Sequence, residues 1–379
     1  MRVLIGCGGT GGHIYPAIAT ADGIKSKFRD AVFLFVGAKG GREVGLVVAA
    51  GYSIKPISIR GFQRKKVLKN VCFPFLLFKS LYQARSIIQS FKPDVVIGTG
   101  GYASFPTLFV AAMQKIPTLI QEQNSVVGLT NQFLVRLVSK ICTGYPDVVL
   151  PCVKEKVVFT GNPIRSALCT FQEDQMDALE YFGFSGFQER KCLLVIGGSG
   201  GASVLNTTIL EWRAQLCALD MQVIWITGER YFESIKKAMK DYRSIKCYPF
   251  LSNMEMAYAA ADIVVSRAGA LSIAELCVRR KLTILVPSSN VVGDHQTKNS
   301  LPLADQGAVI CITDQECPFL LIPKVMELLN DEAQSLELVQ RMEPFAALHA
   351  GAQDKIADVV VDLVKSNADC GPSKSLDFN

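Results

Sequence analysis

Short apolar runs alternate with longer stretches of mixed polarity along the first half of the chain. The runs at 3–6, 31–36, 95–98 and 117–121 have strand length and predict β-strands, whereas the stretches over about 16–28 and 106–114 predict helices. Strands that alternate with helices build a parallel sheet with helices on both faces. The first half therefore predicts a doubly wound, Rossmann-like α/β domain.

The same pattern starts again near Lys191. A strand at 192–196 is followed by a glycine loop at 197–201 and a helix from about Val204, and further strands are expected at 222–227, 262–266 and 283–286. We therefore expect two tandem domains, each opening with strand, glycine loop and helix. The first would span 1–160 and be completed by a C-terminal helix at 345–365. The second would span 161–344, and the polar tail 366–379 would be frayed.

The composition limits the class of protein. The 379 residues are 49% hydrophobic and 20% charged, which suits two well-packed domains, and the net charge of +6 is mild. No apolar run predicts a transmembrane helix and the N-terminus lacks a signal-peptide core, so we expect the protein to stay in the cytoplasm. The 12 cysteines form no CxxC pair and the three histidines lack zinc spacing, so neither disulfides nor a metal site is expected.

The first glycine loop, GCGGTGGH at 6–13, lies between a predicted strand and a predicted helix. Glycine amides and the start of a helix together suit an anionic ligand. Gly6, Gly8 and Gly11 match the GxGxxG fingerprint, but NAD or FAD binding also needs an acid at the end of the second strand, which here ends FVGA. Dinucleotide binding is therefore not expected. His13, at the lip of the loop, is either a helix-start residue bonded to backbone or a general base.

The second glycine loop is GGSGGA at 197–202, and polar residues follow it further along the chain. Two such loops facing one cleft would leave room for a diphosphate against one of them. Glu275 is expected near the start of a helix, where its carboxylate accepts both ribose hydroxyls or pairs with the helix dipole. Gln296 and Asn299 either cap a helix or offer amide donors and acceptors to sugar hydroxyls. Because the chain contains no DxD pair to hold a divalent metal, backbone amides and a helix N-terminus are expected to carry the leaving-group charge.

Five motifs, in order along the chain, resemble the signature series of the MurG family of N-acetylglucosaminyltransferases. They are GGTGGHIYP at 8–16, GTGGY at 98–102, EQN with GLTN at 122–131, GNPIR at 161–165, and RAGA at 267–270 continuing to Glu275. The resemblance implies the GT-B fold, two Rossmann-like domains with a cleft between them, the donor in the C-terminal domain. It implies an inverting, metal-independent transfer of N-acetylglucosamine from UDP. The acceptor would be the 4-hydroxyl of undecaprenyl-diphospho-N-acetylmuramoyl-pentapeptide.

The resemblance also implies donor-side roles. Ser199 would contact the diphosphate and Glu275 the ribose, while Arg165 and the backbone near Leu251 would serve the nucleoside. The N-acetylglucosamine would meet His295, Gln296 and Asn299. The remaining donor contacts would come from Thr10, Gly11, Gly12, Asn131, Gly200, Ala270 and Leu271. At Gly200 the family usually has glutamine, so a side-chain contact to the donor is missing or replaced here.

On the acceptor side, the resemblance implies that His13 is the base and that it lies in the cleft with Asn131. The other acceptor-side residues would be Gly101, Tyr102, Glu122 and Asn124.

A basic and apolar segment at 60–79 predicts contact with an anionic membrane surface. Cationic side chains would face headgroups and aromatic ones acyl chains, and the residues concerned are Arg64, Lys65, Lys66, Lys69, Phe75 and Phe78. The alternative is that Phe75, Phe78 and Tyr82, at helical spacing, belong to the core. Nucleic acid is not expected as a partner, because no basic groove studded with aromatic residues appears. The protein would then lie peripherally on the cytoplasmic face of the bacterial inner membrane.

Other functions stay open at this point. Another GT-B glycolipid glycosyltransferase or a UDP-sugar epimerase would use the same donor loops, but an epimerase needs no lipid-facing surface. A nucleotide-sugar-binding subunit without catalysis is a different class, and such proteins tend to split the two domains between chains.

Overall fold

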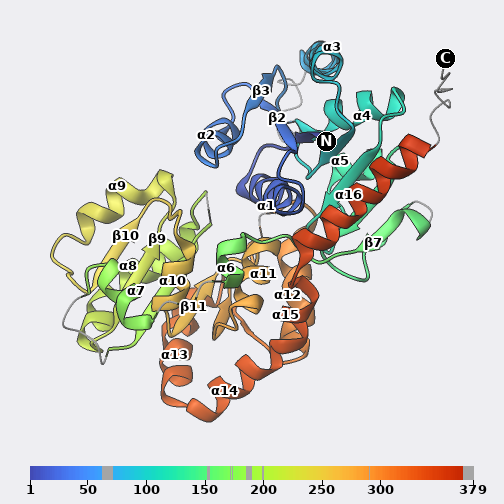
Figure 1. Cartoon of the computed structure of the whole chain (residues 1–379). Coiled ribbons are helices and arrows are strands. Elements are labelled where there is room, and N and C mark those ends of the chain that lie inside the picture. Colours follow the sequence, from blue (N-terminus) through green and yellow to red (C-terminus); the bar gives the residue numbers. More distant parts are fainter. Residues whose placement is uncertain are drawn as a thin grey trace, which may run out of the picture. The chain divides into compact units, whose positions relative to one another are not determined.

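The structure is a computed structural model that describes residues 1–61, 71–151, 154–170, 172, 174–184, 190–198, 200–289 and 291–369. The chain divides into two compact units (Figure 1). The first comprises Met1–Pro163 and the segment from Gly351, and the second comprises Ile164–Ala350. Each unit holds one parallel sheet with helices on both faces, so the doubly wound α/β class expected from the sequence is confirmed.

The first unit is built on a seven-stranded sheet in the order β3-β2-β1-β4-β5-β6-β7. Its strands are β1 (Arg2–Gly6), β2 (Val32–Ala38), β3 (Ile54–Ile57), β4 (Val95–Gly98), β5 (Thr118–Glu122), β6 (Lys140–Thr143) and β7 (Val157–Phe159). Its first five helices are α1 (Gly11–Lys27), α2 (Arg42–Ala49), α3 (Phe73–Phe91), α4 (Ser104–Met113) and α5 (Leu129–Leu134). Every residue of β4 and β5 is buried, as central strands covered on both faces require.

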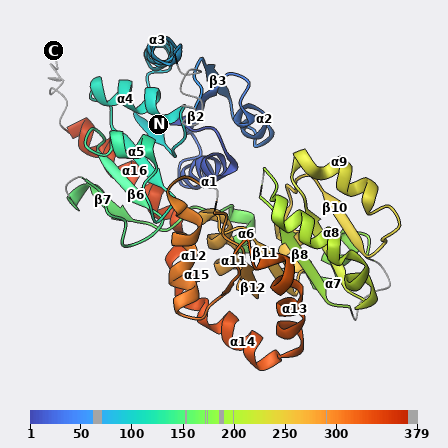
Figure 2. The same cartoon turned by 180° about the vertical axis from the view of Figure 1, so that it is seen from behind.

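The C-terminal segment of the chain completes the first unit. The prediction of a single helix at 345–365 is wrong, because the segment forms two helices, α15 (Glu343–His349) and α16 (Ala352–Asp369). Gly351 lies between them with a φ of 66°, which interrupts the helix. In both views α16 lies against the first unit (Figures 1 and 2), where Lys27 Nζ is 2.6 Å from Asp358 Oδ1. Residues 366–369, expected to be frayed, belong to α16, and the rest of the tail lies outside the described residues.

The second unit is built on a six-stranded sheet in the order β10-β9-β8-β11-β12-β13. Its strands are β8 (Cys192–Ile196), β9 (Gln222–Ile226), β10 (Ile245–Tyr248), β11 (Ile263–Ser266), β12 (Thr283–Leu285) and β13 (Ile310–Cys311). Besides α15, its helices are α6 (Ser166–Thr170), α7 (Gln175–Tyr181), α8 (Ser203–Ala218), α9 (Glu229–Ala238), α10 (Met254–Ala260), α11 (Ala270–Val278), α12 (His295–Asp305), α13 (Cys317–Asn330) and α14 (Glu332–Arg341).

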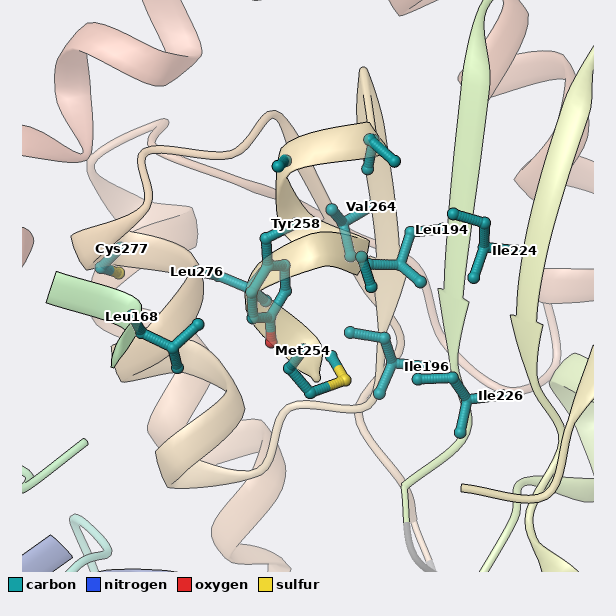
Figure 3. Close-up of a cluster of buried hydrophobic side chains, with 14 of the residues drawn as sticks. Leu168, Leu194, Ile196, Ile224, Ile226, Met254, Tyr258, Val264, Leu276 and Cys277 are labelled. Atoms are coloured by element: carbon teal, nitrogen blue, oxygen red, sulfur yellow. The ribbon is translucent and has the colours of Figure 1, made fainter. Parts of the chain in front are cut away.

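Alternate residues of the second sheet face two separate cores. Leu194 and Ile196 of β8 pack on one face, whereas Leu193 and Val195 pack on the other, as the two-residue period of a strand requires. Figure 3 shows the first of these cores, in which the ring of Tyr258 from α10 lies among aliphatic side chains of the sheet.

In both sheets the strand order reverses between two central strands that carry glycine motifs. In the first unit β1 pairs with β4, and Gly6 lies opposite Gly98. In the second unit β8 pairs with β11, and Ile196 lies opposite Ser266. Open α/β sheets bind ligands outside the carboxyl ends of the strands at such reversal points. The fold therefore gathers the glycine motifs of each unit at the position where a ligand is expected.

Candidate active site

The first glycine loop joins β1 to α1, and its conformation sets the place of His13. Helix α1 begins at Gly11, five residues before the expected start at 16, because the amides of His13 and Ile14 already donate to the Thr10 carbonyl oxygen, at 3.0 and 3.2 Å. Pro16 lies inside the helix rather than at its start. His13 is consequently the third residue of a regular helix at the carboxyl edge of the sheet.

Three neighbours hold the half-buried His13 side chain and backbone. The imidazole Nδ1 lies 3.2 Å from Thr10 Oγ1, and the Thr99 hydroxyl donates to the His13 carbonyl oxygen at 2.7 Å. Gly100, with φ of 97°, lies against the ring, since a Cβ there would come within 2.6 Å of His13 Cδ2. The imidazole is thus oriented by groups from two different loops of the same unit.

The glycine loops after β1 and β4 pack directly on each other. A Cβ at Gly101, where φ is 79°, would lie 1.9 Å from the Gly8 carbonyl oxygen, so no other residue fits there. The ring of Tyr102 lies over Gly9, 3.1 Å from the position that a Cβ would take. Burial, and secondly the charge of Glu43, raises the pKa of the Tyr102 phenol, so its hydroxyl is a donor at neutral pH.

The Glu122 side chain, expected on the acceptor side, is turned into the protein. Its side chain is 1% exposed. One carboxylate oxygen accepts from the backbone and side chain of Asn124, at 3.1 and 3.3 Å, and the other from Gly128 N at 2.9 Å and Asn131 Nδ2 at 2.8 Å. Glu122 therefore orients two asparagines that the sequence pointed to. Asn131 Oδ1 is buried and has no hydrogen-bond partner among the described residues, so it is an unused acceptor at this edge.

In the second unit, Arg165, Glu275 and Tyr258 form one polar cluster. The Arg165 guanidinium donates to Glu275 Oε1 at 3.3 Å and to the Ser252 carbonyl oxygen, next to Leu251, at 2.7 Å. The Tyr258 hydroxyl donates to Glu275 Oε2 at 2.9 Å. Burial first, and the Glu275 carboxylate second, raises the pKa of Tyr258 well above its usual range, which keeps this hydroxyl a donor.

Sequence reasoning missed Tyr258 as a member of this cluster. It lies in the helix segment MEMAYAA and is fully buried, with 0% of its surface exposed to solvent. A buried tyrosine hydroxyl needs a hydrogen-bond partner, so its position in a buried helix was a signal that some polar group lies nearby. Glu275, expected near the start of its helix, is the sixth residue of α11 and lies in the second turn.

The second glycine loop, between β8 and α8, is shaped by close backbone contacts. Gly201, with φ of 74°, packs on Gly228, since a Cβ at Gly228 would lie 2.4 Å from Gly201 Cα. A Cβ at Gly200 would meet nothing within 4 Å, so a larger residue there has open space. Ser199, expected to contact the diphosphate, lies outside the described residues.

The starts of α11 and α12 carry the other expected donor contacts. Gly269 caps α11, so Ala270 and Leu271 lie in its first turn, where backbone amides have no partner within the helix. His295 begins α12, and Gln296 Oε1 accepts from Ser288 N at 2.8 Å, which ties the preceding loop to the helix. Asn299, expected beside the sugar, is fully buried.

Helix α3 presents an apolar surface to solvent. Phe75, Phe78 and Tyr82 are 77%, 73% and 75% exposed, so the alternative that these three belong to the core is wrong, because Ser80, Ala84 and Ile88 form the buried side of the helix. The expected basic contacts Arg64, Lys65, Lys66 and Lys69 lie outside the described residues. None of the helices in the described ranges has both the length and the apolar character needed to cross a bilayer.

A groove of about 300 Å³ lies beside this surface. It is lined by Leu81, Tyr82, Arg85, Phe109, Val110, Met113 and Gln114 of α3 and α4 and their boundary. Tyr82 is common to the groove and to the exposed face, so the two form one continuous apolar area with a cation at its edge.

The two parallel-sheet units, each with a glycine loop at its reversal point, coincide with the two domains of a glycosyltransferase family of the GT-B fold. Residues 3–143 match the glycosyltransferase family 28 N-terminal domain and residues 192–355 match the family 28 C-terminal domain, so the chain belongs to glycosyltransferase family 28.

Full-length relatives agree with the resemblance found in the sequence. The chain is 44% identical over 365 residues to the UDP-N-acetylglucosamine--N-acetylmuramyl-(pentapeptide) pyrophosphoryl-undecaprenol N-acetylglucosamine transferase of Parabacteroides distasonis, covering 96% of this chain and 98% of that one. The crystal structure of MurG from Acinetobacter baumannii is 27% identical with a TM-score of 0.72, over 95% and 99% of the two chains. The Streptomyces glycosyltransferase SsfS6, complexed with thymidine diphosphate, is 14% identical with a TM-score of 0.60 over 95% and 99%, which shows the shared fold. The resemblance to the MurG family is confirmed.

Proposed function

We propose that this chain transfers N-acetylglucosamine from UDP-N-acetylglucosamine to the 4-hydroxyl of undecaprenyl-diphospho-N-acetylmuramoyl-pentapeptide, a step of peptidoglycan synthesis. The observation that carries the proposal is the near full-length likeness to the Parabacteroides distasonis enzyme named for this transfer. The two reversal-point sites support it, because one is suited to a nucleoside diphosphate and the other to a sugar hydroxyl.

The second unit would hold the donor. The ribose hydroxyls would donate to Glu275, whose carboxylate Arg165 and Tyr258 already orient. The diphosphate would lie on the β8–α8 loop, with Ser199, and against the first-turn amides of α11 at Ala270 and Leu271. When UDP leaves, its charge would be stabilised by these amides and by the helix dipole.

The first unit would hold the acceptor and the base. For His13 Nε2 to take the proton of the attacking hydroxyl, Nδ1 must carry the other proton, and Thr10 Oγ1 lies 3.2 Å away to accept it. The hydroxyl oxygen would then attack the anomeric carbon as the bond to UDP breaks, in one displacement that inverts the configuration.

We propose that the transfer needs no metal. Two features support this: the chain has no DxD pair, and backbone amides at the β8–α8 loop and at α11 offer the diphosphate a set of donors.

The exposed face of α3 would bring the enzyme to its membrane-anchored acceptor. Phe75, Phe78 and Tyr82 would enter the acyl boundary, while Lys79 and Arg85 on the same helix would meet anionic headgroups. At roughly 1 kcal/mol per cation near such a surface, binding would be reversible. The protein would then lie peripherally on the cytoplasmic face of the inner membrane.

The test is transfer of radiolabelled N-acetylglucosamine from its UDP donor to a short-chain analogue of the lipid-linked muramoyl-pentapeptide. We expect label in the extracted lipid product, at a rate that a chelator leaves largely intact. Loss of activity with the chelator would overturn metal independence. Conversion of the UDP-sugar without any acceptor would instead indicate an epimerase. Tight donor binding without either reaction would indicate another acceptor or a binding subunit.

A further inference from the structure

A fully buried carboxylate lies beneath the first glycine loop. Glu43, in the first turn of α2, has 0% exposure. Its Oε1 accepts from Ala38 N, at the end of β2, at 2.7 Å, and its Oε2 lies 3.5 Å from Gly9 N, in the loop after β1. Burying a carboxylate costs folding free energy unless hydrogen bonds compensate for the lost water. The position of Glu43 therefore calls for a structural or functional explanation.

Three glycines make room for this carboxylate. A Cβ at Gly8 would lie 2.7 Å from Glu43 Oε1, one at Gly37 2.5 Å from its Cγ, and one at Gly41 2.4 Å from its Cδ. These glycines come from the β1–α1 loop, from β2 and from the start of α2. The side chain therefore fills a space that three separate segments leave open, and it is in van der Waals contact with the backbone of each.

The segment that Glu43 contacts carries the proposed base machinery. Gly9 lies under the ring of Tyr102, and the next residue, Thr10, is both the cap of α1 and the partner of His13 Nδ1. Dinucleotide enzymes use an acid near the end of the second strand to hold a ribose. Here the acid bonded to the end of that strand faces inward and holds the loop instead.

We infer that Glu43 is a positioning residue, whose carboxylate fixes the backbone at Gly9 and thereby the placement of Thr10 and His13. The inference rests on the proposed function for its effect on catalysis, although the loop contact itself does not. If Glu43 served only to stabilise the unit, its loss would lower the melting temperature and leave the turnover of the folded enzyme unchanged.

The deciding variant is Glu43→Gln. Its amide oxygen can keep the short bond to Ala38 N, but its amide nitrogen then presents a donor to the Gly9 N–H, so the loop contact is lost selectively. Glu155→Gln is the matched control, because Glu155 is an exposed glutamate of the same unit. If Glu43→Gln does not fold, Glu43→Asp keeps the charge and shortens the reach by one methylene, and the same measurements apply to it.

Three quantities are measured: kcat with the acceptor analogue, Kd for UDP-N-acetylglucosamine, and amide hydrogen exchange of the 6–13 segment. We expect kcat to fall about 10- to 100-fold, as small misplacements of catalytic groups do, with faster exchange in the loop and an unchanged donor Kd. Unchanged kcat and loop exchange, with only a lower melting temperature, would overturn the inference. If the unmodified protein shows no transfer, the proposed function fails, whereas hydrogen exchange still decides whether Glu43 holds the loop.

Discussion

The Arg165 guanidinium lies 3.3 Å from the Glu275 carboxylate, although 110 residues separate the two along the chain. Both side chains are largely shielded, at 21% and 13% exposure, and Tyr258 holds the second oxygen of the same carboxylate. The carboxylate is thus oriented before any ligand binds. A fixed acceptor of this kind discriminates strongly between a ligand that carries the matching hydroxyl and an analogue that lacks it, because the analogue leaves hydrogen bonds of the site unmade.

We predict that Glu275→Ala raises the KM for UDP-N-acetylglucosamine about 10- to 100-fold. The variant removes a charged acceptor from the ribose hydroxyls, and hydrogen bonds to charged groups contribute about 1.5–3 kcal/mol. Steady-state kinetics at saturating acceptor measure the effect. Glu233→Ala, at an exposed glutamate of α9, is the control. An unchanged KM would remove Glu275 from the donor site.

His13→Ala is expected to lower kcat by about 10²–10⁴, the usual contribution of a general base, while donor Kd stays the same. Thr10→Val should have a smaller effect in the same direction, because Nδ1 then loses the partner that favours the proton there. Single-turnover kinetics separate this loss from product release. A decrease of less than tenfold for His13→Ala would reject the residue as the base.

Gly200→Gln should lower the donor KM about threefold to tenfold. The position has open space, and an added amide would restore a side-chain hydrogen bond that contributes about 0.5–1.5 kcal/mol. Gly198→Gln is the informative contrast: Gly198 has φ of 77°, so a side chain there is strained and should lower the melting temperature. A Gly200→Gln variant with raised KM would show that the open space is needed by the donor itself.

Replacing both Phe75 and Phe78 by serine should weaken binding to anionic vesicles at least tenfold, because each exposed ring would otherwise bury apolar area in the acyl boundary. Vesicle co-sedimentation measures this. Activity on a water-soluble acceptor analogue and the melting temperature should not change. Phe133→Ser, at a ring that is 70% exposed on α5, is the matched control. Equal vesicle binding by the double variant and the control would place the membrane contact elsewhere.

Lys281 predicts a pH-dependent stability. Burial, and secondly the charge of Arg279, lowers its pKa from 10.5 to about 8, while its Nζ donates to the Ala261 carbonyl oxygen at 2.9 Å. Between these two pKa values Lys281 is protonated in the unfolded chain and neutral in the folded protein, so the free energy of unfolding rises as the pH rises. Below this range Lys281 is charged in both states, and the folded protein bears the full cost of burying that charge.

Urea unfolding at about pH 7 and about pH 10 checks this, with Lys281→Met compared with the unmodified protein. From the lower to the higher pH, the free energy of unfolding of the unmodified protein should rise relative to that of Lys281→Met. Lys298→Met, at an exposed lysine of α12, should show no such shift. The same pH response in Lys281→Met as in the unmodified protein would exclude Lys281 as the cause.

Local patterns predicted the elements and the loops, but not the orientation of the acidic side chains in them. The strand–glycine loop–helix order around His13 and around Gly200 is local, because glycines permit backbone conformations that other residues avoid. Glu122 ends the strand β5 and Glu275 follows the RAGA motif in α11, and the sequence alone does not say which way either carboxylate points. In the structure Glu122 turns inward to two asparagines, whereas Glu275 is held by an arginine and a tyrosine from distant segments.

The sequence by itself determined the alternation of strands and helices, the two tandem units, the glycine loops and the ordered motifs of the family. These are properties of neighbouring residues, whose propensities and backbone freedom act over a few positions. Only the tertiary structure decided that β1 lies beside β4, that Tyr258 reaches Glu275, that Glu43 lies beneath Gly9 and that Phe75 faces solvent. Each of these depends on burial and on hydrogen bonds between segments that are far apart in the chain. Such segments become neighbours only when the whole chain folds.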